Sequence, residues 1–252
     1  MDHAADPSHP RYRSLLMRHR LEVAAKKGML ADSAMIAHGR GEAYDYLLGE
    51  TTIPSADIAA QVALQALLQA EHPVLSVNGN VVALAGDEIL KLADRIGCPL
   101  EVNIFYRTPE RMEALLTDLN ERKERLDLSV EILGANPDAT IPGLKGPRAK
   151  CEAKGILQAD AILVPLEDGD RCEALVAMGK TVIVIDLNPL SRSSQRGSIT
   201  IVDELSRCLE NMLEMNMEGL PSVESYDHHQ TLQEALNAIV NGMKNKFSEA
   251  KE

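Results

Sequence analysis

Two short apolar runs in the middle of the chain give the clearest structural signal. Residues 161–164 and 181–185 are each only a few residues long and rich in Ile and Val. Such runs predict buried strands of a parallel sheet. Between them, residues 172–178 follow a helical pattern that closes at Gly179 and Lys180. Strand, helix and strand in this order predict a β-α-β unit.

The same alternation continues on both sides of this unit. Further strand patterns occupy residues 73–77, 100–106, 130–133 and 199–202. Helical patterns occupy residues 9–27, 42–48, 54–69, 87–95, 109–126, 204–215 and 232–243. This alternation predicts an α/β protein in three layers, with a mostly parallel sheet of five to six strands and further helices at both ends. We expect one domain over residues 1–252, in which helical parts (1–72 and 218–252) flank a core (73–217).

Helix ends are marked by capping residues. Thr108 precedes a proline at the start of the helix 109–126, and Asp203 precedes the helix 204–215. Short oxygen-bearing side chains at these positions accept hydrogen bonds from the first free amides of a helix. We therefore expect Thr108 and Asp203 to be the N-caps of their helices.

Two polar loops follow the strands of the central unit. Residues 165–171 read PLEDGDR, and residues 186–198 read DLNPLSRSSQRGS. In open α/β sheets, ligands bind beyond the carboxyl ends of the strands, where both loops are expected. Asp186 ends a strand at the place where nucleotide sites hold an acid for ribose hydroxyls, and Arg192 can grip phosphate oxygens with two donors. These loops predict a nucleotide or phosphate-ester site; a flexible surface loop is the lesser alternative for 191–196.

The acidic loop has two interpretations of equal weight. Asp168 and Asp170 could hold Mg²⁺, although hard cations usually keep several waters and take few protein carboxylates. The alternative is a solvated turn that binds nothing.

Other candidates lie at strand ends and near glycines. Arg40 stands between Gly39 and Gly41, in a segment that is either an anion-binding loop or a tight turn. Asn78 and Asn80 follow the strand 73–77 and lead into a helix, so they are candidates for substrate hydrogen bonds; turn formation is the alternative.

Two cations and one histidine complete the set of candidates. The long loop after residue 133 carries Lys145 and Arg148, two cations at the presumed ligand edge. Long ordered loops are often functional. His38 precedes the Gly-Arg-Gly segment, and a lone histidine is more often structural than catalytic.

Composition narrows the class of partner. A net charge of −12 over 252 residues disfavours nucleic acid, because phosphate backbones require a basic surface. No apolar run is long enough to cross a bilayer, and the N-terminus lacks a signal-peptide core, so we expect a cytoplasmic protein. Four scattered cysteines without a CxxC pair disfavour a zinc ribbon or a disulfide framework.

A set of motifs between Ser8 and Asp203 adds a family resemblance. In order along the chain they are HPRYRSL, IAHGRGEAYDYLLGE, SVNGN, ILGAN, VPLEDGDR, and DLNPLSRSS followed by ITIVD. Together they resemble the archaeal 4-phosphopantoate–β-alanine ligases, also called phosphopantothenate synthetases. No single motif is specific, but the ordered set is.

The resemblance implies a fold, a reaction and a set of contacts. It implies a Rossmann-like homodimer that uses ATP to join 4-phosphopantoate to β-alanine, giving 4′-phosphopantothenate for coenzyme A biosynthesis with release of AMP and pyrophosphate. The family often has Asn where this chain has Glu204. The ATP contacts that the resemblance implies are Arg18, Arg40, Asp186, Leu187, Asn188, Arg192, Ser193, Glu204 and Leu205.

The implied chemistry assigns further roles. An acyl-adenylate would form while Arg40, Arg192 and Mg²⁺ offset the developing negative charge. Lys145 and Arg148 are expected at the substrate phosphate, and His38 is the candidate base for the β-alanine amine. We also expect the Ala-rich helix 54–69 in the homodimer interface. Two alternatives remain: a regulatory nucleotide-binding module without catalysis, and a small-molecule kinase that uses the same ATP site.

Overall fold

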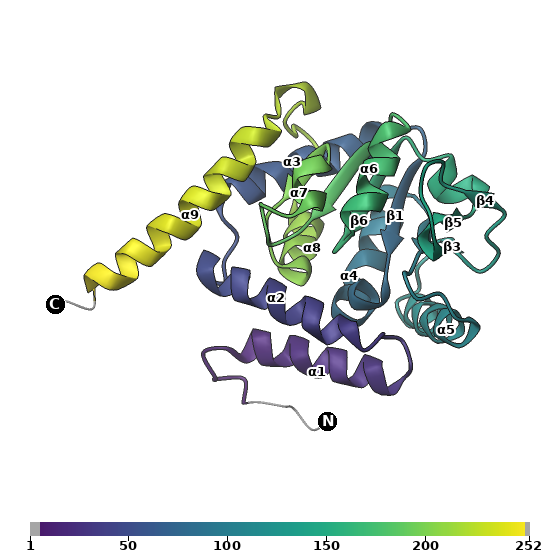
Figure 1. Cartoon of the computed structure of the whole chain (residues 1–252), viewed down its shortest axis with the longest axis horizontal. Coiled ribbons are helices and arrows are strands. Elements are labelled where there is room, and N and C mark those ends of the chain that lie inside the picture. The colour runs from purple at the N-terminus through teal and green to yellow at the C-terminus, as the bar shows by residue number, and fades with distance from the viewer. Residues whose placement is uncertain (1–5, 250–252) are drawn as a thin grey trace.

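A parallel sheet of six strands forms the centre of the molecule (Figure 1). The computed structural model describes residues 6–249, without the side chains of 243–249. The strand order is β3-β2-β1-β6-β7-β8, and each neighbouring pair is parallel. The strands are β1 (Pro73–Val77), β2 (Leu100–Val102), β3 (Ile132–Leu133), β6 (Ala161–Pro165), β7 (Thr181–Ile185) and β8 (Ile199–Ile201). This order reverses between β1 and β6, as in the dinucleotide-binding α/β fold, and confirms the predicted fold class.

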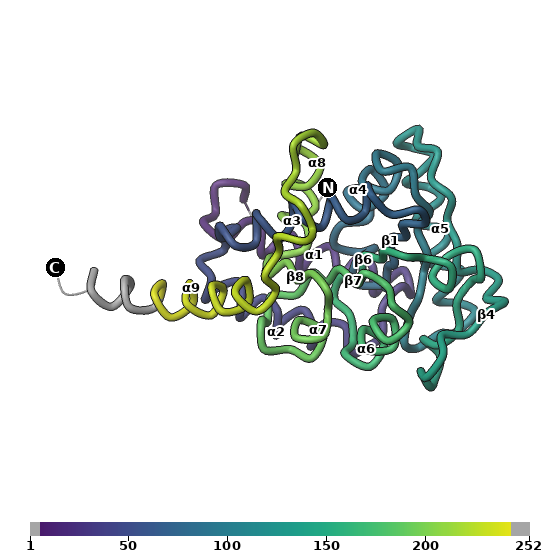
Figure 2. The backbone as a smooth tube through the Cα atoms, turned by 90° about the horizontal axis from the view of Figure 1, so that it is seen from above, coloured from purple at the N-terminus to yellow at the C-terminus, as the bar shows by residue number. Residues whose placement is uncertain are grey.

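Helices cover both faces of the sheet, with α3, α4, α5 and α8 on one side and α6 and α7 on the other (Figure 2). The helices are α1 (Tyr12–Lys26), α2 (Ser33–Leu48), α3 (Pro54–Gln69), α4 (Gly79–Ile96), α5 (Pro109–Arg125), α6 (Gly169–Ala177), α7 (Arg192–Arg196), α8 (Leu205–Glu214) and α9 (His228–Glu249). Shorter pieces are the antiparallel pair β4 (Ala139–Thr140) and β5 (Lys150–Cys151), a π-helical turn (Ala153–Leu157) and two 3₁₀ turns (Pro147–Ala149 and Val223–Ser225). Among the described residues, no helix is both long and apolar enough to span a membrane.

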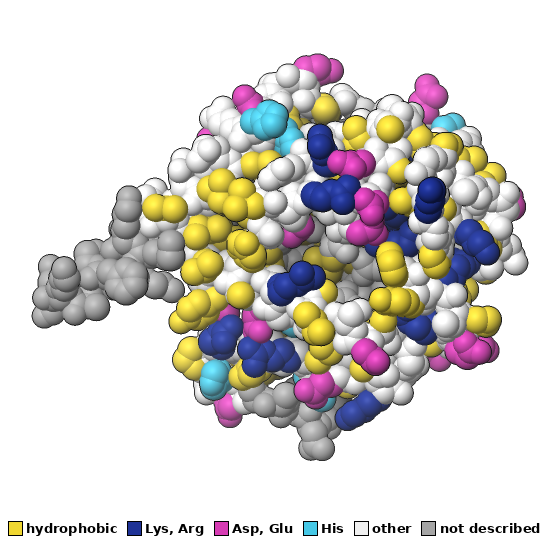
Figure 3. Space-filling model, in the orientation of Figure 1, with side chains coloured by type: hydrophobic (Ala, Val, Ile, Leu, Met, Phe, Trp, Pro, Cys, Tyr) yellow, Lys and Arg dark blue, Asp and Glu magenta, His cyan; other side chains and the backbone are white. Residues whose placement is uncertain are grey.

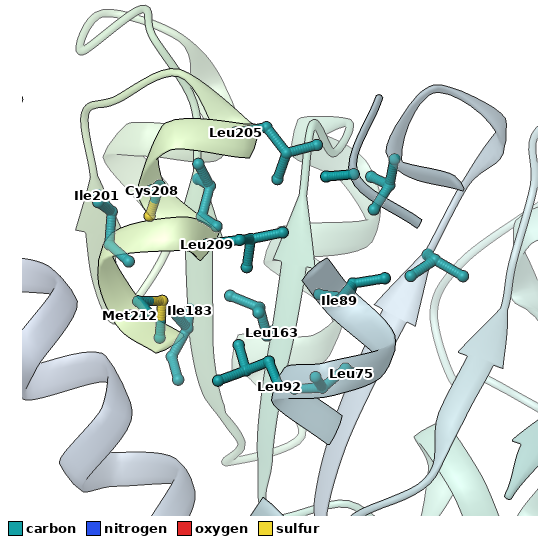
Figure 4. Packing of buried hydrophobic residues seen from close by; sticks show 14 of the residues in the cluster. Leu75, Ile89, Leu92, Leu163, Ile183, Ile201, Leu205, Cys208, Leu209 and Met212 are labelled. Atoms are coloured by element: carbon teal, nitrogen blue, oxygen red, sulfur yellow. The ribbon is translucent and has the colours of Figure 1, made fainter. Parts of the chain in front are cut away.

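The strand sequences fix which side chains face each layer. Leu75, Leu163 and Ile183 pack on the side of α4 and α8, as Figure 4 shows. Ile162 and Val182, one residue away from two of them, belong to a second cluster under α6. Because both faces are buried, the strands are apolar at nearly every position. Burying each such side chain contributes about 1.5–3 kcal/mol, so the sheet is a rigid base for the loops at its edge.

Helices α1 and α2 form an antiparallel hairpin beyond the carboxyl ends of the strands (Figure 1). Arg18 of α1 donates to the Glu42 carboxylate of α2 through Nε and Nη2 at 2.9–3.2 Å, and Arg11 binds Glu50 at 3.0 Å. α1 packs on α4, and α2 packs on α9. The hairpin therefore covers the edge at which ligands bind in this class of fold.

The prediction of a Gly-Arg-Gly loop is wrong. Gly39 and Gly41 lie inside α2, which continues without a break to Leu48 and ends at Gly49 with a φ of 88°. A Cβ on Gly41 would lie 3.6 Å from the side chain of Leu187. Glycine costs about 1 kcal/mol relative to alanine inside a helix, so this segment is helical despite the local preference of its two glycines.

The prediction of a flexible loop at 191–196 is also wrong. Most of this segment is the short helix α7, which begins after Ser191, whose side chain accepts from the Ser194 amide at 3.0 Å. The predicted N-cap at Asp203 is one residue too early. Glu204 caps α8 instead, because Asp203 is turned inward to accept from Thr52 and Arg207.

Other predicted bounds differ at the sheet edge. The strands predicted at 100–106 and 130–133 shorten to β2 and β3, because β3 is an edge strand paired over only two residues. The final helix is longer than predicted and begins at His228. By contrast, α3, β1 and β7 have the predicted bounds, and Thr108 caps α5 as predicted.

The alanines of α3 pack within this chain. Ala56, Ala59, Ala60 and Ala63 are buried, and the helix lies against β8, α8 and α9. Ile58 is the large apolar side chain of α3 that stays exposed, at 51%. The small residues are therefore accounted for by contacts inside the chain, and the homodimer interface on this helix stays a prediction.

Candidate active site

A cleft of about 990 Å³ lies between the α1–α2 hairpin and the carboxyl ends of β1, β6, β7 and β8. The hollow opens on the face shown in Figure 3, with acidic and basic side chains around it. Its volume is at the upper end of the range for small-molecule sites, about 300–1,000 Å³. The cleft spans the point where the strand order reverses, so it has a β7–β8 half and a β1–β2 half.

The β7–β8 half gathers most of the residues that the resemblance assigns to ATP. They come from the ends of two strands, from two helix starts and from the hairpin. Seven of the nine line the cleft: Arg40, Asp186, Leu187, Asn188, Ser193, Glu204 and Leu205. Their roles at ATP stay predictions, but the fold brings all seven to the same half of the cleft.

Asp186 is held rigidly at the end of β7. Its carboxylate accepts from Ser191 Oγ at 2.5 Å and from the Asn188 amide at 3.0 Å. Burial raises the pKa of Asp186, while these hydrogen bonds and the charge of Arg40 oppose that shift. A half-buried acceptor fixed in this way is suited to the hydroxyls of a ribose.

Glu204 has a structural task besides facing the cleft. Its carboxylate accepts from the amides of Ser206 at 2.9 Å and Arg207 at 3.0 Å, and it lies 3.4 Å from Arg13. An asparagine could accept the same capping bonds. The substitution of Glu for Asn at this position is therefore compatible with an intact start of α8.

Arg18 and Arg192 lie outside the lining of the cleft. Arg18 is committed to Glu42, as described above. Arg192 points away on α7 and binds Asp170 and Glu173, each at 2.8 Å, with 59% of its side chain exposed. To reach a nucleotide, each arginine would have to leave its carboxylate partner.

Both asparagines of the Asn-Gly-Asn segment line the β1–β2 half. Asn78 caps α4 by accepting from the Val81 amide at 3.2 Å, and its Nδ2 donates to the Leu166 carbonyl at 3.1 Å. Asn80 Nδ2 donates to the Ala34 carbonyl at 3.1 Å. These bonds tie β1 to β6 and α4 to the hairpin, so the asparagines organise the cleft as well as facing it.

A buried charge cluster underlies the point where the two halves meet. Arg148 binds Glu167 at 2.5 Å and Asp168 at 2.7 Å, and Glu167 also pairs with Arg171. The side chains of Glu167 and Arg171 are 1% and 0% exposed. Arg171 reaches across to Ser76 of β1 at 2.8 Å. In the sequence, Glu167 and Arg171 are four residues apart. This spacing usually indicates an exposed ion pair on a helix, so the sequence did not predict that the pair is buried.

The remaining charged candidates are separated. Lys145 is exposed and does not line the cleft. Asp168 is paired with Arg148, while Asp170 is paired with Arg192 on the outer surface. No group of three or more His, Cys, Asp or Glu that could hold a metal occurs in the described part of the chain. These contacts do not bring the two aspartates together as one metal site, and their Mg²⁺ role stays a prediction.

His38 faces the cleft from α2 with an unused ring nitrogen. Its Nε2 is buried and meets no hydrogen-bond partner among the described residues. Burial lowers the pKa of His38, although the charges of Glu42 and Glu204 oppose the shift. A neutral imidazole near pH 7 with a free nitrogen can accept a proton from a bound ligand.

Several arginines that line the cleft were not singled out from the sequence. Arg11, Arg13 and Arg207 each have carboxylate partners, at Glu50, Glu210 and Asp45. Arg111 has none among the described residues. Its position in the first turn after Thr108 and Pro109 was a readable signal, because that turn follows a strand end and so lies at the ligand edge.

The chain matches a known family model and several individual proteins. A model described as phosphopantothenate/pantothenate synthetase matches residues 55–242. A protein named 4-phosphopantoate–β-alanine ligase from Thermococcus kodakarensis is 48% identical over 237 residues, which cover 91% of this chain and 89% of the relative. A protein of the same name from Methanosarcina mazei is 47% identical over 249 residues, with 96% of each chain covered. Both organisms are archaea.

Proposed function

The chain belongs to the phosphopantothenate/pantothenate synthetase family, and we propose that it joins 4-phosphopantoate to β-alanine in coenzyme A biosynthesis. The reaction makes an amide bond, and the family implies that ATP drives it. The observation that supports this function best is the cleft, because seven residues expected at ATP line its β7–β8 half and leave the β1–β2 half for the acid and the amine.

An acyl-adenylate route accounts for the chemistry. A carboxylate oxygen of 4-phosphopantoate attacks the α-phosphorus of ATP, and the bond from that phosphorus to pyrophosphate breaks. The amine nitrogen of β-alanine then attacks the acyl carbon, the carbon–oxygen bond to AMP breaks, and the nitrogen loses a proton. Both steps develop negative charge on oxygen, so cations placed at the reacting centre lower the barriers.

Three side chains have roles in this route. Arg40 faces the β7–β8 half without a carboxylate partner among the described residues, so its charge is available to the phosphates of ATP. Asp186 accepts from the ribose. His38 takes the proton from the β-alanine nitrogen, because its buried Nε2 has an open acceptor position in the neutral form.

The metal and the assembly follow from the same proposal. Mg²⁺ usually reaches such sites with ATP and is held chiefly by phosphate oxygens and water. It would offset phosphate charge there, and Asp168 is one of several acidic side chains lining the cleft that could support it. We also propose a homodimer, with the exposed Ile58 of α3 in its interface, and a cytoplasmic location, where ATP is supplied.

Product analysis tests the function. Purified protein with ATP, Mg²⁺ and both substrates should form AMP and pyrophosphate one-for-one with the amide, and net turnover should stop when either substrate is left out. ADP as the nucleotide product would instead indicate a kinase or an acyl-phosphate route, and binding without turnover would indicate a regulatory module. Sedimentation at micromolar concentration checks the dimer, since a monomer would have a mass of 27.5 kDa.

A further inference from the structure

Arg111 is a cation of the β1–β2 half that no carboxylate compensates within the described part of the chain. It lies in the first turn of α5 and lines the cleft. Its terminal nitrogens donate to the backbone carbonyls of Tyr106 and, at 3.3 Å, of Met29. Both acceptors are neutral, so they fix the orientation of the guanidinium and leave its charge unpaired.

The Nε atom of Arg111 shows that the chain leaves this group incompletely bonded. It is buried and has no hydrogen-bond partner among the described residues. An arginine keeps its charge inside a protein, and burying a charge without a counter-ion is costly. A site of this kind favours an anion that arrives with the ligand.

The start of α4 lies in the same corner. A Cβ on Gly79, the first residue of α4, would lie 3.5 Å from Nη2 of Arg111. It would also lie 2.7 Å from the Met29 carbonyl oxygen, so only glycine fits there without movement. The first turn of α4, which is followed by non-helical dihedral angles at Ala85, begins with the amides of Gly79 and Asn80, since Asn78 already accepts from the Val81 amide; such amides at a helix start suit phosphate oxygens. Asn80 faces the cleft from this turn.

We propose that Arg111 and the first turn of α4 bind the phosphate group of 4-phosphopantoate; this assignment rests on the proposed function. A planar guanidinium with neighbouring amides suits the oxygens of a phosphate monoester. The corner lies across the strand-order reversal from Asp186. In this arrangement the phosphate group of 4-phosphopantoate is held in the β1–β2 half, and its carboxylate is directed toward the nucleotide in the β7–β8 half.

This corner is a better match than the two cations singled out from the sequence. Lys145 lies outside the lining of the cleft. Arg148 is already neutralised by Glu167 and Asp168, and its Nε donates to Asn103 at 3.3 Å. A phosphate at Arg148 would have to displace a buried carboxylate, whereas Arg111 offers an uncompensated charge.

Steady-state kinetics of Arg111→Gln and Arg111→Lys test the assignment. We expect the KM for 4-phosphopantoate to rise roughly 10–100-fold in Arg111→Gln, the cost of one charge-assisted contact, and less in Arg111→Lys. The KM values for ATP and β-alanine should change less than twofold. With unphosphorylated pantoate, the wild type and both variants should be equally slow. The matched control is Arg125→Gln, in the last turn of α5, where Arg125 pairs with Asp87 far from the cleft lining.

An equal loss with pantoate and 4-phosphopantoate, or an unchanged KM for 4-phosphopantoate, would overturn the assignment. A rise confined to the KM for ATP would move the nucleotide to this corner and overturn it as well.

A second variant guards against a loss of folding. Asn80→Asp places a negative charge in the corner, where a helix start tolerates it. Asp also loses the donation of Asn80 Nδ2 to the Ala34 carbonyl, so we expect a lower melting temperature. Below that temperature the KM for 4-phosphopantoate should still be at least tenfold higher, because KM does not depend on the fraction of folded protein.

Calorimetric titration with inorganic phosphate tests the phosphate site at Arg111 independently of the proposed reaction. Wild type should bind phosphate more tightly than Arg111→Gln does, even if the proposed reaction fails. Equal binding by both proteins would contradict the site.

Discussion

The two halves of the cleft present their polar groups in different ways. In the β7–β8 half, Asp186 and Glu204 are held by hydrogen bonds from their own loop or helix start. In the β1–β2 half, Arg111 is oriented by neutral carbonyls, and its charge is left open. Local bonds can be formed by a short segment of sequence, whereas the partly buried charge of Arg111, which meets only neutral carbonyls, depends on the surrounding fold. The carboxylates of the first half are therefore fixed as acceptors for hydroxyl groups, beside the open charge of Arg40, whereas the second half offers the charge of Arg111 to an anion.

Between the halves lies the buried cluster of Glu167, Arg148 and Arg171, which joins the end of β6 to β1 and to the loop before β5. It contributes more to the relative position of the halves than to the binding of either ligand.

Glu167→Gln should have the largest effect, because it leaves two buried arginines without their shared counter-ion. Removing one partner from a buried ion pair costs about 3–5 kcal/mol in the free energy of unfolding. Denaturant unfolding measures this directly. Arg125→Gln, which breaks a surface pair, should cost less than about 1 kcal/mol. A loss for Glu167→Gln as small as that of Arg125→Gln would show that the cluster is solvated and does not hold the halves together.

Asp186→Asn should affect only the β7–β8 half. We expect the KM for ATP to rise about 10–100-fold, the cost of one hydrogen bond to a charged acceptor, and the KM for 4-phosphopantoate to stay unchanged. Initial rates with each substrate varied in turn provide the measurement. If both KM values rose together, the halves would not be independent, and the comparison above would fail.

Arg192→Lys tests how far the nucleotide half extends. If Arg192 turns from Asp170 and Glu173 to grip a phosphate, lysine keeps the charge but loses the two-donor fork. We expect roughly a tenfold rise in the KM for ATP, with an unchanged melting temperature because the side chain is 59% exposed. If Arg192→Lys had the same kinetics as the wild type, Arg192 would serve only in surface ion pairs and would not contact ATP.

The role of His38 should be visible in the pH dependence of kcat. Because burial lowers its pKa below the usual 6.5, the neutral, proton-accepting form persists to lower pH. We expect kcat to fall only once the pH drops through this lowered pKa. His38→Gln should lower kcat and remove that acid limb. An acid limb that persists unchanged in the variant would assign the proton transfer to another group.

The same shift affects stability. A histidine with a lower pKa in the folded state binds fewer protons there than in the unfolded chain. Its contribution to folding is therefore complete above the unfolded pKa of about 6.5 and is lost as the pH falls through the folded pKa. His38→Gln should flatten the stability profile in this acid range, as thermal unfolding at several pH values would show.

Sequence patterns predicted the periodic elements well and the irregular ones poorly. The helix α3 and the strands β1 and β7 have the predicted bounds because their hydrophobic period is strong and their ends carry proline or glycine. The Gly-Arg-Gly segment and the Ser-rich segment were predicted as loops, and both are helical. In each case Gly or Ser residues favour a loop locally, and this preference is weak enough for the tertiary context to override it.

The sequence by itself determined the fold class, the family and most of one wall of the cleft. Asp186, Leu187 and Asn188 directly follow a strand, so their place at the ligand edge follows from the order of elements alone. Only the tertiary structure decided which charges are free. Arg148 and Arg111 both lie near strand ends, and the sequence does not distinguish their charges. In the structure, Glu167 neutralises Arg148, whereas Arg111 donates to two backbone carbonyls. Pairing depends on distances between segments far apart in the chain, and a sequence pattern does not contain those distances.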